Sequence, residues 1–172
     1  IKPDRLGEVN EFAARAIKNK SRYQTIEKAT GVPWYLIAIA HERESGGRFD
    51  RQFGQGWPLT SKSKWEPYIG PFKTFEDSAI AALKIDGLDK VIDWRLEKIL
   101  YYVTTFNGWG YWNYHNKMPS PYIWGATNQQ VRGKYVADGK FNGNVMDSQL
   151  GCAAMLKALM NFDSSIKPER ED

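Results

Sequence analysis

The segment that most limits the fold runs from Pro33 to Gly47 and reads PWYLIAIAHERESGG. Residues Trp34 to Glu44 predict a helix, because Pro33 suits a first helical turn and the glycine pair Gly46-Gly47 ends the helix. Apolar side chains cover most sides of this helix, so it should pass through a core. The helix nevertheless ends in His-Glu-Arg-Glu. Burying this ending is costly unless the fold uses a carboxylate there.

A helical projection indicates which carboxylate faces the core. At about 100° per residue, the side chains within about 60° of Ile37 are Trp34, His41 and Glu44. Glu42 lies about 140° away, so we expect Glu44 to be the inward-facing carboxylate. Burial and the negative end of the helix dipole both disfavour the charged form, and both are expected to raise the pKa of Glu44. A carboxyl that keeps its proton can act as the general acid in glycoside cleavage.

The rest of the chain predicts a mainly α fold of the α+β type, in a single domain spanning residues 1–172. Apolar spacing and end signals predict further helices at 5–19, 22–30, 75–85, 93–106 and 147–162. Two Gly- and Pro-rich stretches, 48–72 and 107–146, predict long loops that form a cleft, and the first could contain a small β-hairpin. The polar tail 163–172 is expected to fray.

Composition argues against two classes of protein. Hydrophobic residues make up 42% of the chain, but no run of about 18 apolar residues occurs, so we expect no membrane insertion. The net charge of +4 favours an anionic polymer as partner, yet the basic residues are scattered and predict no nucleic-acid binding. The single Cys152 is expected to pack on an apolar helix face. Because Ile1 opens the chain without a leader, we expect a processed piece whose export signal is not visible.

Aromatic residues crowd into WGYWNYHNKMPSPYIWG, residues 109–125. Rings in such a loop-rich stretch can line a sugar or base-stacking site, or they can fill a core, and the sequence leaves both open. His41-Glu42 begins a zinc-protease motif, but the second histidine would have to fall at Ser45. The segment 138–149 resembles a calcium loop only weakly, because Lys140 stands at a ligand place. We therefore expect no metal and no cofactor.

Several motifs together resemble one known family. HERESGGRF is similar to the end of the catalytic helix in the lysozyme superfamily, in the branch of goose-type lysozymes and soluble lytic transglycosylases. TTFNGWGYW resembles that branch's Tyr-Asn-Gly segment, with Phe106 in place of the tyrosine. In order, VPWYLIAIAHERES, EDSAIAAL, FNGWGYW, SPYIWGATNQQVRGKYVADGKF and DSQLG resemble phage endolysins and bacterial peptidoglycan hydrolases over residues 32–156.

The resemblance implies a mainly α lysozyme-like fold that cleaves the β-1,4 bond between N-acetylmuramic acid and N-acetylglucosamine. It implies Glu44 as the catalytic acid. It also implies a set of substrate-binding residues, the last three of them placed by loop position and chemistry: Ser45, Asn107, Gln55, Tyr111 and Tyr122. Closer relatives carry an Asn-Gly-Asp-Pro-Leu loop, where this chain reads QGWPL with Trp57 in place of the acid.

The second catalytic group stays open. Asp50 is the nearest candidate for a second carboxylate, whereas a transglycosylase would need Glu44 alone because the substrate's own groups complete the reaction. The same site is therefore expected to act either as a muramidase or as a lytic transglycosylase. We expect a monomer that acts on peptidoglycan glycan strands in the bacterial envelope, as a phage endolysin or a bacterial cell-wall enzyme.

Three alternatives remain. HERESGG also resembles the His-Glu-x-x-Gly-Gly stretch of plant-type chitinases, which would make Glu42 the acid. A catalytically silent module that only grips the cell wall would explain the aromatic loops equally well. Glu44 could also be a solvated helix-end residue paired with Arg43 or Arg48.

Overall fold

The computed structural model describes residues 1–64 and 69–168. The chain forms two compact units. The central unit spans Arg15–Trp94, and the terminal unit combines Ile1–Ala14 with Arg95–Asp172. The chain is mainly helical, with 52% of it in helices, and the described part also contains a small two-stranded antiparallel sheet, so the expected α+β, mainly α fold class is confirmed.

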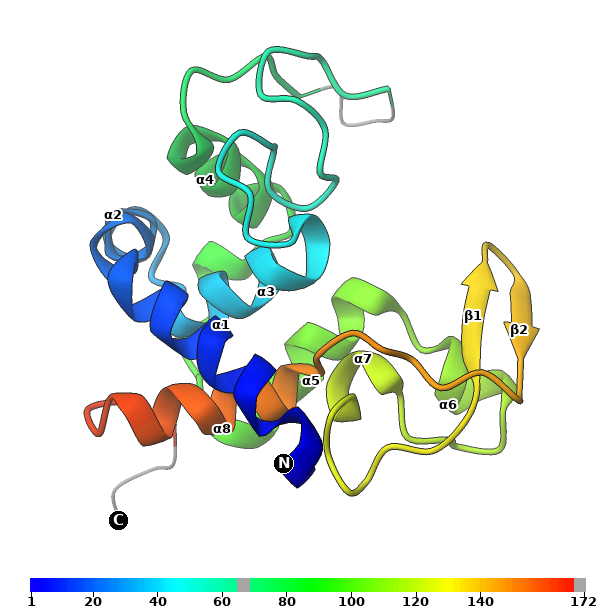
Figure 1. Cartoon of the computed structure of the whole chain (residues 1–172). Coiled ribbons are helices and arrows are strands. Elements are labelled where there is room, and N and C mark those ends of the chain that lie inside the picture. The colour runs from blue at the N-terminus through cyan, green and yellow to red at the C-terminus, as the bar shows by residue number, and fades with distance from the viewer. Residues whose placement is uncertain (65–68, 169–172) are drawn as a thin grey trace. The chain divides into compact units, whose positions relative to one another are not determined.

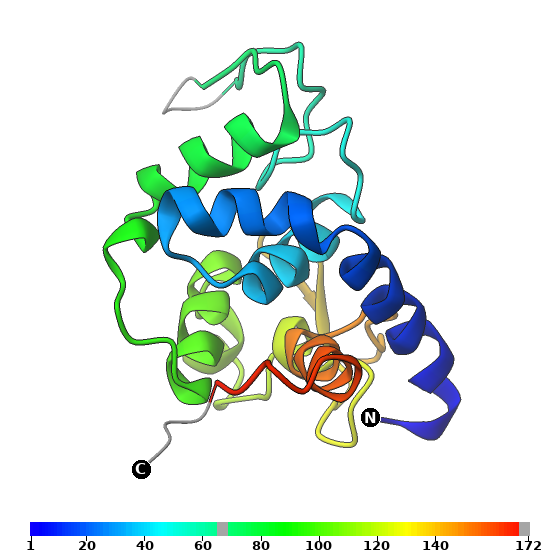
Figure 2. The same cartoon turned by 90° about the vertical axis from the view of Figure 1, so that its left-hand side faces the viewer.

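In its described residues the central unit contains a group of packed helices and a long loop. Its helices are α2 (Lys20–Thr30), α3 (Trp34–Ser45) and α4 (Phe75–Ile85), followed by the short 3-10 helix η2 (Leu88–Lys90). Helix α2 packs against both α3 and α4, as Figure 2 shows. The apolar side chains of these helices that are nearly inaccessible to solvent include Ile26, Leu36, Ile37, Ile39, Phe75 and Leu83.

Local sequence signals set the ends of these helices. Gly31 follows α2 with a left-handed φ of 76°, and Gly46 follows α3 with a φ of 62°. Thr74 caps α4, since its side chain accepts a hydrogen bond of 3.1 Å from the backbone nitrogen of Asp77. The boundaries predicted from glycine and threonine are therefore confirmed to within a residue or two.

Most remaining elements belong to the terminal unit. They are η1 (Pro3–Arg5), α5 (Leu96–Asn107), α6 (Gly110–Tyr114), α7 (Pro121–Trp124), β1 (Lys134–Ala137), β2 (Lys140–Asn142) and α8 (Cys152–Phe162). Helix α1 (Leu6–Lys18) begins in this unit and continues into the central one. Helix α8 packs against α5 and α7, and Cys152 is buried at its start.

The hairpin lies in a different place from the one expected (Figure 1). Strands β1 and β2 pair Lys134 with Asn142 and Tyr135 with Phe141, inside the aromatic stretch. In the described part of residues 48–72 the only β pairing is an isolated bridge between Arg51 and Pro58. The hairpin expected in that loop is therefore wrong, and residues 65–68 lie outside the described part.

Helix α8 begins at Cys152, five residues after the predicted start at Asp147. The Asp147 carboxylate accepts bonds from the backbone of Gln149 (3.1 Å) and from Lys134 (3.0 Å), which holds the chain in a turn. The nitrogen of Gly151 then bonds to the carbonyl of Gly125 at 2.9 Å. These long-range contacts keep residues 147–151 out of the helix.

The tail is ordered where the structure describes it. The Asp163 carboxylate accepts from the backbone and hydroxyl of Ser165, at 3.0 and 2.6 Å. Ile166, which follows this turn, is 4% exposed. Among the described helices none is long and apolar enough to span a bilayer.

Candidate active site at the end of helix α3

Helix α3 is buried over most of its length, as predicted. Residues 36–41 are each at most 3% exposed, and the four residues that follow are half-buried. Glu44 is one of these four, in the last turn of the helix. The apolar stripe thus leads to a carboxylate that is partly withdrawn from solvent.

His41 anchors this last turn in an aromatic cluster. Its ring lies 4.1 Å from Phe75 and 4.8 Å from Phe49 between centroids, and its Nδ1 lies 2.9 Å from the Tyr23 hydroxyl. Burial lowers the pKa of His41 to about 4 and raises the pKa of Tyr23, so both groups are neutral and share a hydrogen bond between the hydroxyl and Nδ1. A neutral, fully buried His41 therefore positions the helix rather than transferring protons at its surface.

The backbone at the helix end is closed by a left-handed cap. The Gly46 nitrogen bonds to the carbonyl of Glu42 at 3.0 Å, and the Gly47 nitrogen bonds to that of His41 at 3.2 Å. The Ser45 hydroxyl also donates to the His41 carbonyl at 3.2 Å. The Ser45 side chain thus bonds within its own helix. Together, these three hydrogen bonds fix the turn that carries Glu44.

Glu42 has a partner of its own. Arg15 donates to its carboxylate at 3.0 Å, and the Glu42 side chain is 21% exposed. A Cβ added at Gly47 would lie only 2.9 Å from Glu42 Oε2, so the carboxylate is held on both sides. This pairing gives Glu42 a structural role in joining α1 to α3.

The loop after α3 folds back onto the helix end. A Cβ at Gly56 would lie 3.3 Å from the carbonyl oxygen of Glu44 and 3.9 Å from Ser45 Cβ. Gln55, predicted to bind substrate, precedes this contact and is exposed. Within the central unit, Gln55 is therefore the residue next to Gly56, which contacts the end of the helix that carries Glu44.

A residue that sequence reasoning missed holds this loop. The Gln52 side chain is 1% exposed, and its amide donates to the carbonyls of Pro58 (3.2 Å) and Ser61 (2.6 Å). Its backbone nitrogen also bonds to the Trp57 carbonyl at 2.6 Å. No local pattern distinguishes Gln52 from Gln55 in the sequence, because only the folded loop shows which one is buried.

Asp50, the candidate second carboxylate, is exposed and paired. Arg48 donates to both of its oxygens, at 3.1 and 2.8 Å. This bidentate hydrogen bonding lowers the pKa of Asp50, which makes the carboxylate a weaker base.

The other predicted site residues belong to the terminal unit. Asn107 is the exposed last residue of α5, and Tyr122 is buried in α7 at 5% exposure. Tyr111 is 7% exposed, and its hydroxyl accepts from the backbone nitrogen of Tyr135 at 3.0 Å. Tyr111 therefore ties α6 to strand β1, in addition to any contact with substrate.

The described residues, 1–64 and 69–168, contain no group of three His, Cys, Asp or Glu side chains placed to hold a metal ion. No protein family model, curated protein or solved structure matches the chain. The function is therefore argued from the residues and their geometry.

Proposed function

We propose that this protein is a peptidoglycan-degrading glycosidase of the lysozyme-like kind, with Glu44 as its general acid. The bond cleaved is the β-1,4 bond between N-acetylmuramic acid and N-acetylglucosamine, and the place of action is the bacterial envelope. The observation that carries the proposal is the half-buried Glu44 at the capped end of the buried helix α3. The net charge of +4 also suits an anionic cell-wall polymer.

In this mechanism Glu44 donates its proton to the bridging oxygen while the bond from that oxygen to C1 of the muramic acid breaks. The sugar develops oxocarbenium character, and the leaving sugar departs with its hydroxyl restored. This role requires Glu44 to hold its proton before the reaction. The capped last turn holds the carboxyl in place, which reduces the entropy lost in reaching the transition state.

Two routes complete the reaction. In a muramidase, water adds to C1 and gives up a proton to a base. In a lytic transglycosylase, the substrate's own 6-hydroxyl adds to C1 to form a 1,6-anhydro ring and gives its proton to the Glu44 carboxylate. The ion pair of Asp50 with Arg48 weakens Asp50 as a base, which favours a route that depends on Glu44 alone.

The choice of Glu44 over Glu42 rests on the position of each residue on α3 and on the structural role of Glu42. Glu42 is engaged by Arg15 at 3.0 Å and lies against the Gly47 turn, so the chitinase-like alternative would have to break a structural ion pair. Glu44 follows the buried stripe of Ile37 and His41 instead. Support for the sugar chemistry comes from the motif resemblance and from the exposed aromatic rings of the terminal unit.

The experiment compares Glu44→Gln with its matched control Glu42→Gln, each assayed on peptidoglycan and on chitin. Loss of a general acid typically lowers a rate by about 10²–10⁴-fold, and this loss is expected for Glu44→Gln on peptidoglycan. Glu42→Gln should keep most of the activity and lose some stability. The reverse pattern, or activity only on chitin, would favour the Glu42 alternative. Wall binding without turbidity loss in the unaltered protein would favour the silent module.

A further inference from the structure

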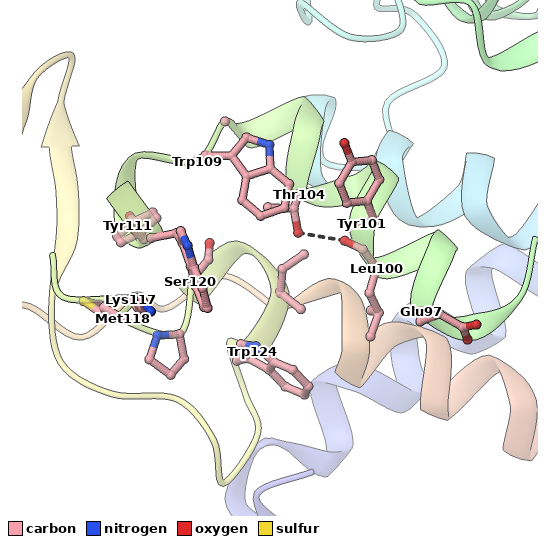
Figure 3. Close-up of a pocket in the computed structure, with 14 residues that line it drawn as sticks. Glu97, Leu100, Tyr101, Thr104, Trp109, Tyr111, Lys117, Met118, Ser120 and Trp124 are labelled. Atoms are coloured by element: carbon pink, nitrogen blue, oxygen red, sulfur yellow. Dashed lines mark hydrogen bonds between the residues drawn. The ribbon is translucent and has the colours of Figure 1, made fainter. Parts of the chain in front are cut away.

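The terminal unit contains a cavity of about 360 Å³, formed by helices α5, α6 and α7 and the segment between the last two. Figure 3 shows its lining, with Trp109 and Tyr101 on one side and Trp124 on the other. Trp112 and Tyr111 also line it. We call it the α5–α7 pocket. Its volume lies within the range of pockets that hold small ligands.

Several of its rings are open to solvent. The exposed fractions are 52% for Trp112, 51% for Tyr101 and 37% for Trp109. The Tyr101 and Trp109 rings lie 5.5 Å apart between centroids at 49°, so together they form a bent aromatic wall. Exposed rings of this size around a cavity contribute little to a core, and they mark a binding site for a ligand with an apolar face.

Two hydroxyls add hydrogen-bonding capacity to the pocket. Thr104 donates to the Leu100 carbonyl at 2.7 Å and can still accept, as Figure 3 shows by the dashed line. The Ser120 oxygen accepts from the Tyr122 backbone nitrogen at 3.3 Å and can still donate. An acceptor and a donor beside an aromatic wall suit a ligand with both hydroxyls and an apolar face, such as a pyranose ring with an acetamido group.

The charges on the lining favour an anionic substituent. The Nζ of Lys117 lies 5.5 Å from the centroid of the Trp112 ring, and Lys117 forms no ion pair with any described residue. Glu97, also on the lining, is paired with Arg95 at 3.5 Å. The negative charge of Glu97 is thus balanced by Arg95, whereas no described carboxylate balances the positive charge of Lys117.

We infer that the α5–α7 pocket binds an N-acetylated sugar that carries a carboxylate, namely the N-acetylmuramic acid unit of the glycan strand. The sugar face packs on Trp112 and its neighbours, and the lactyl or peptide carboxylate pairs with Lys117. This inference rests on the proposed function for the identity of the glycan. It gives the terminal unit a role in holding the strand that does not use Glu44.

The test measures binding to the full chain carrying Glu44→Gln, so that ligand is not consumed. Two soluble probes are titrated by calorimetry: chitotetraose, and a tetrasaccharide of alternating N-acetylglucosamine and N-acetylmuramic acid. Adding Trp112→Ala should weaken both about tenfold or more. Adding Lys117→Gln should weaken the muramic acid probe about three- to tenfold and leave chitotetraose unchanged.

The matched control is Tyr114→Ala, which removes another exposed ring of α6, at 78% exposure, that does not line the pocket. It should bind both probes as the parent does. Circular dichroism and thermal melting establish that each variant is folded.

The outcomes separate the two proposals. Unchanged binding in folded Trp112→Ala overturns the pocket, whatever Glu44 does. Trp112-dependent binding together with an unaltered protein that releases no sugar fragments supports the pocket and contradicts the glycosidase. Equal loss of both probes in Lys117→Gln contradicts the assigned carboxylate contact.

Discussion

The protonation of His41 makes a specific prediction about stability and pH. The side chain is completely buried, and burial lowers its pKa from 6.5 to about 4. Between these two values the unfolded chain binds a proton that the folded protein excludes. Stability should therefore be full above pH 6.5 and should fall as the pH drops toward 4. At about 1.36 kcal/mol per pH unit, the whole interval corresponds to about 3 kcal/mol.

Neighbouring carboxyls act in a lower range of pH. Arg22 pairs with Glu76 and lowers the pKa of that carboxyl from 4.5, so its contribution is present above pH 4.5 and is lost below it. The pKa of Asp50 is also lowered, from 3.8, so its contribution to stability is present above pH 3.8 and is lost below it. Carboxyls whose pKa is raised, such as that of Asp86, can also titrate toward the interval from pH 4.5 to 6.5. The contribution of His41 is therefore the part of the pH dependence that His41→Phe removes, and it should amount to a loss of about 2.5 kcal/mol between pH 7 and 4.5.

The assay is urea unfolding followed by tryptophan fluorescence at half-unit steps from pH 4.5 to 7.5. His41→Phe should be less stable overall by about 1–3 kcal/mol, because the Tyr23 hydroxyl loses its partner. Its stability should nevertheless vary much less with pH in this interval. His115→Gln removes the other histidine and serves as the control that keeps His41. A flat profile in the unaltered protein, or an unchanged slope in His41→Phe, would refute the reasoning.

Two further substitutions test the packing around the site and in the terminal unit. Gln52→Ala removes two hydrogen bonds to loop carbonyls and should cost about 2–3 kcal/mol in urea unfolding, while a loss below about 0.5 kcal/mol would show that the loop does not depend on it. Gly151→Ala should cost about 3 kcal/mol or more, because its Cβ would overlap the backbone of Gly125. Gly7→Ala is its control: the site is open, and alanine should be neutral or stabilise α1 by up to about 1 kcal/mol. Equal melting temperatures for the two alanine variants would contradict the close approach at Gly151.

Local chemistry explains which parts of the fold could be predicted. Thr74, Gly31 and Gly46 each act within a few residues of their own helix, and all three mark its end correctly. The hairpin depends on contacts across the chain instead: His115 stacks on Phe141 at 3.6 Å and bonds to the Tyr135 hydroxyl at 2.9 Å. Residues 134–142 also carry a local signal, because Asp138-Gly139 is a dipeptide that favours a tight hairpin turn.

The same distinction applies to the candidate site. The helical projection predicts that Glu44 lies on the buried side, because periodicity is a local property, whereas in the structure Glu42 and Glu44 are both half-buried. The partner of Glu42 could not be predicted, since Arg15 lies 27 residues earlier in the chain. The crowding of rings in residues 109–125 was visible, but only packing shows that Trp112 stays open while Tyr111 is buried.

The central claim is tested most directly by mass spectrometry of the fragments that the purified protein releases from peptidoglycan. The account predicts saccharide fragments ending in N-acetylmuramic acid, either as a reducing sugar or lighter by one water as a 1,6-anhydro ring, and their near absence with Glu44→Gln. Fragments cut only in the peptide stems, or the same saccharide fragments at the same rate from Glu44→Gln, would contradict it.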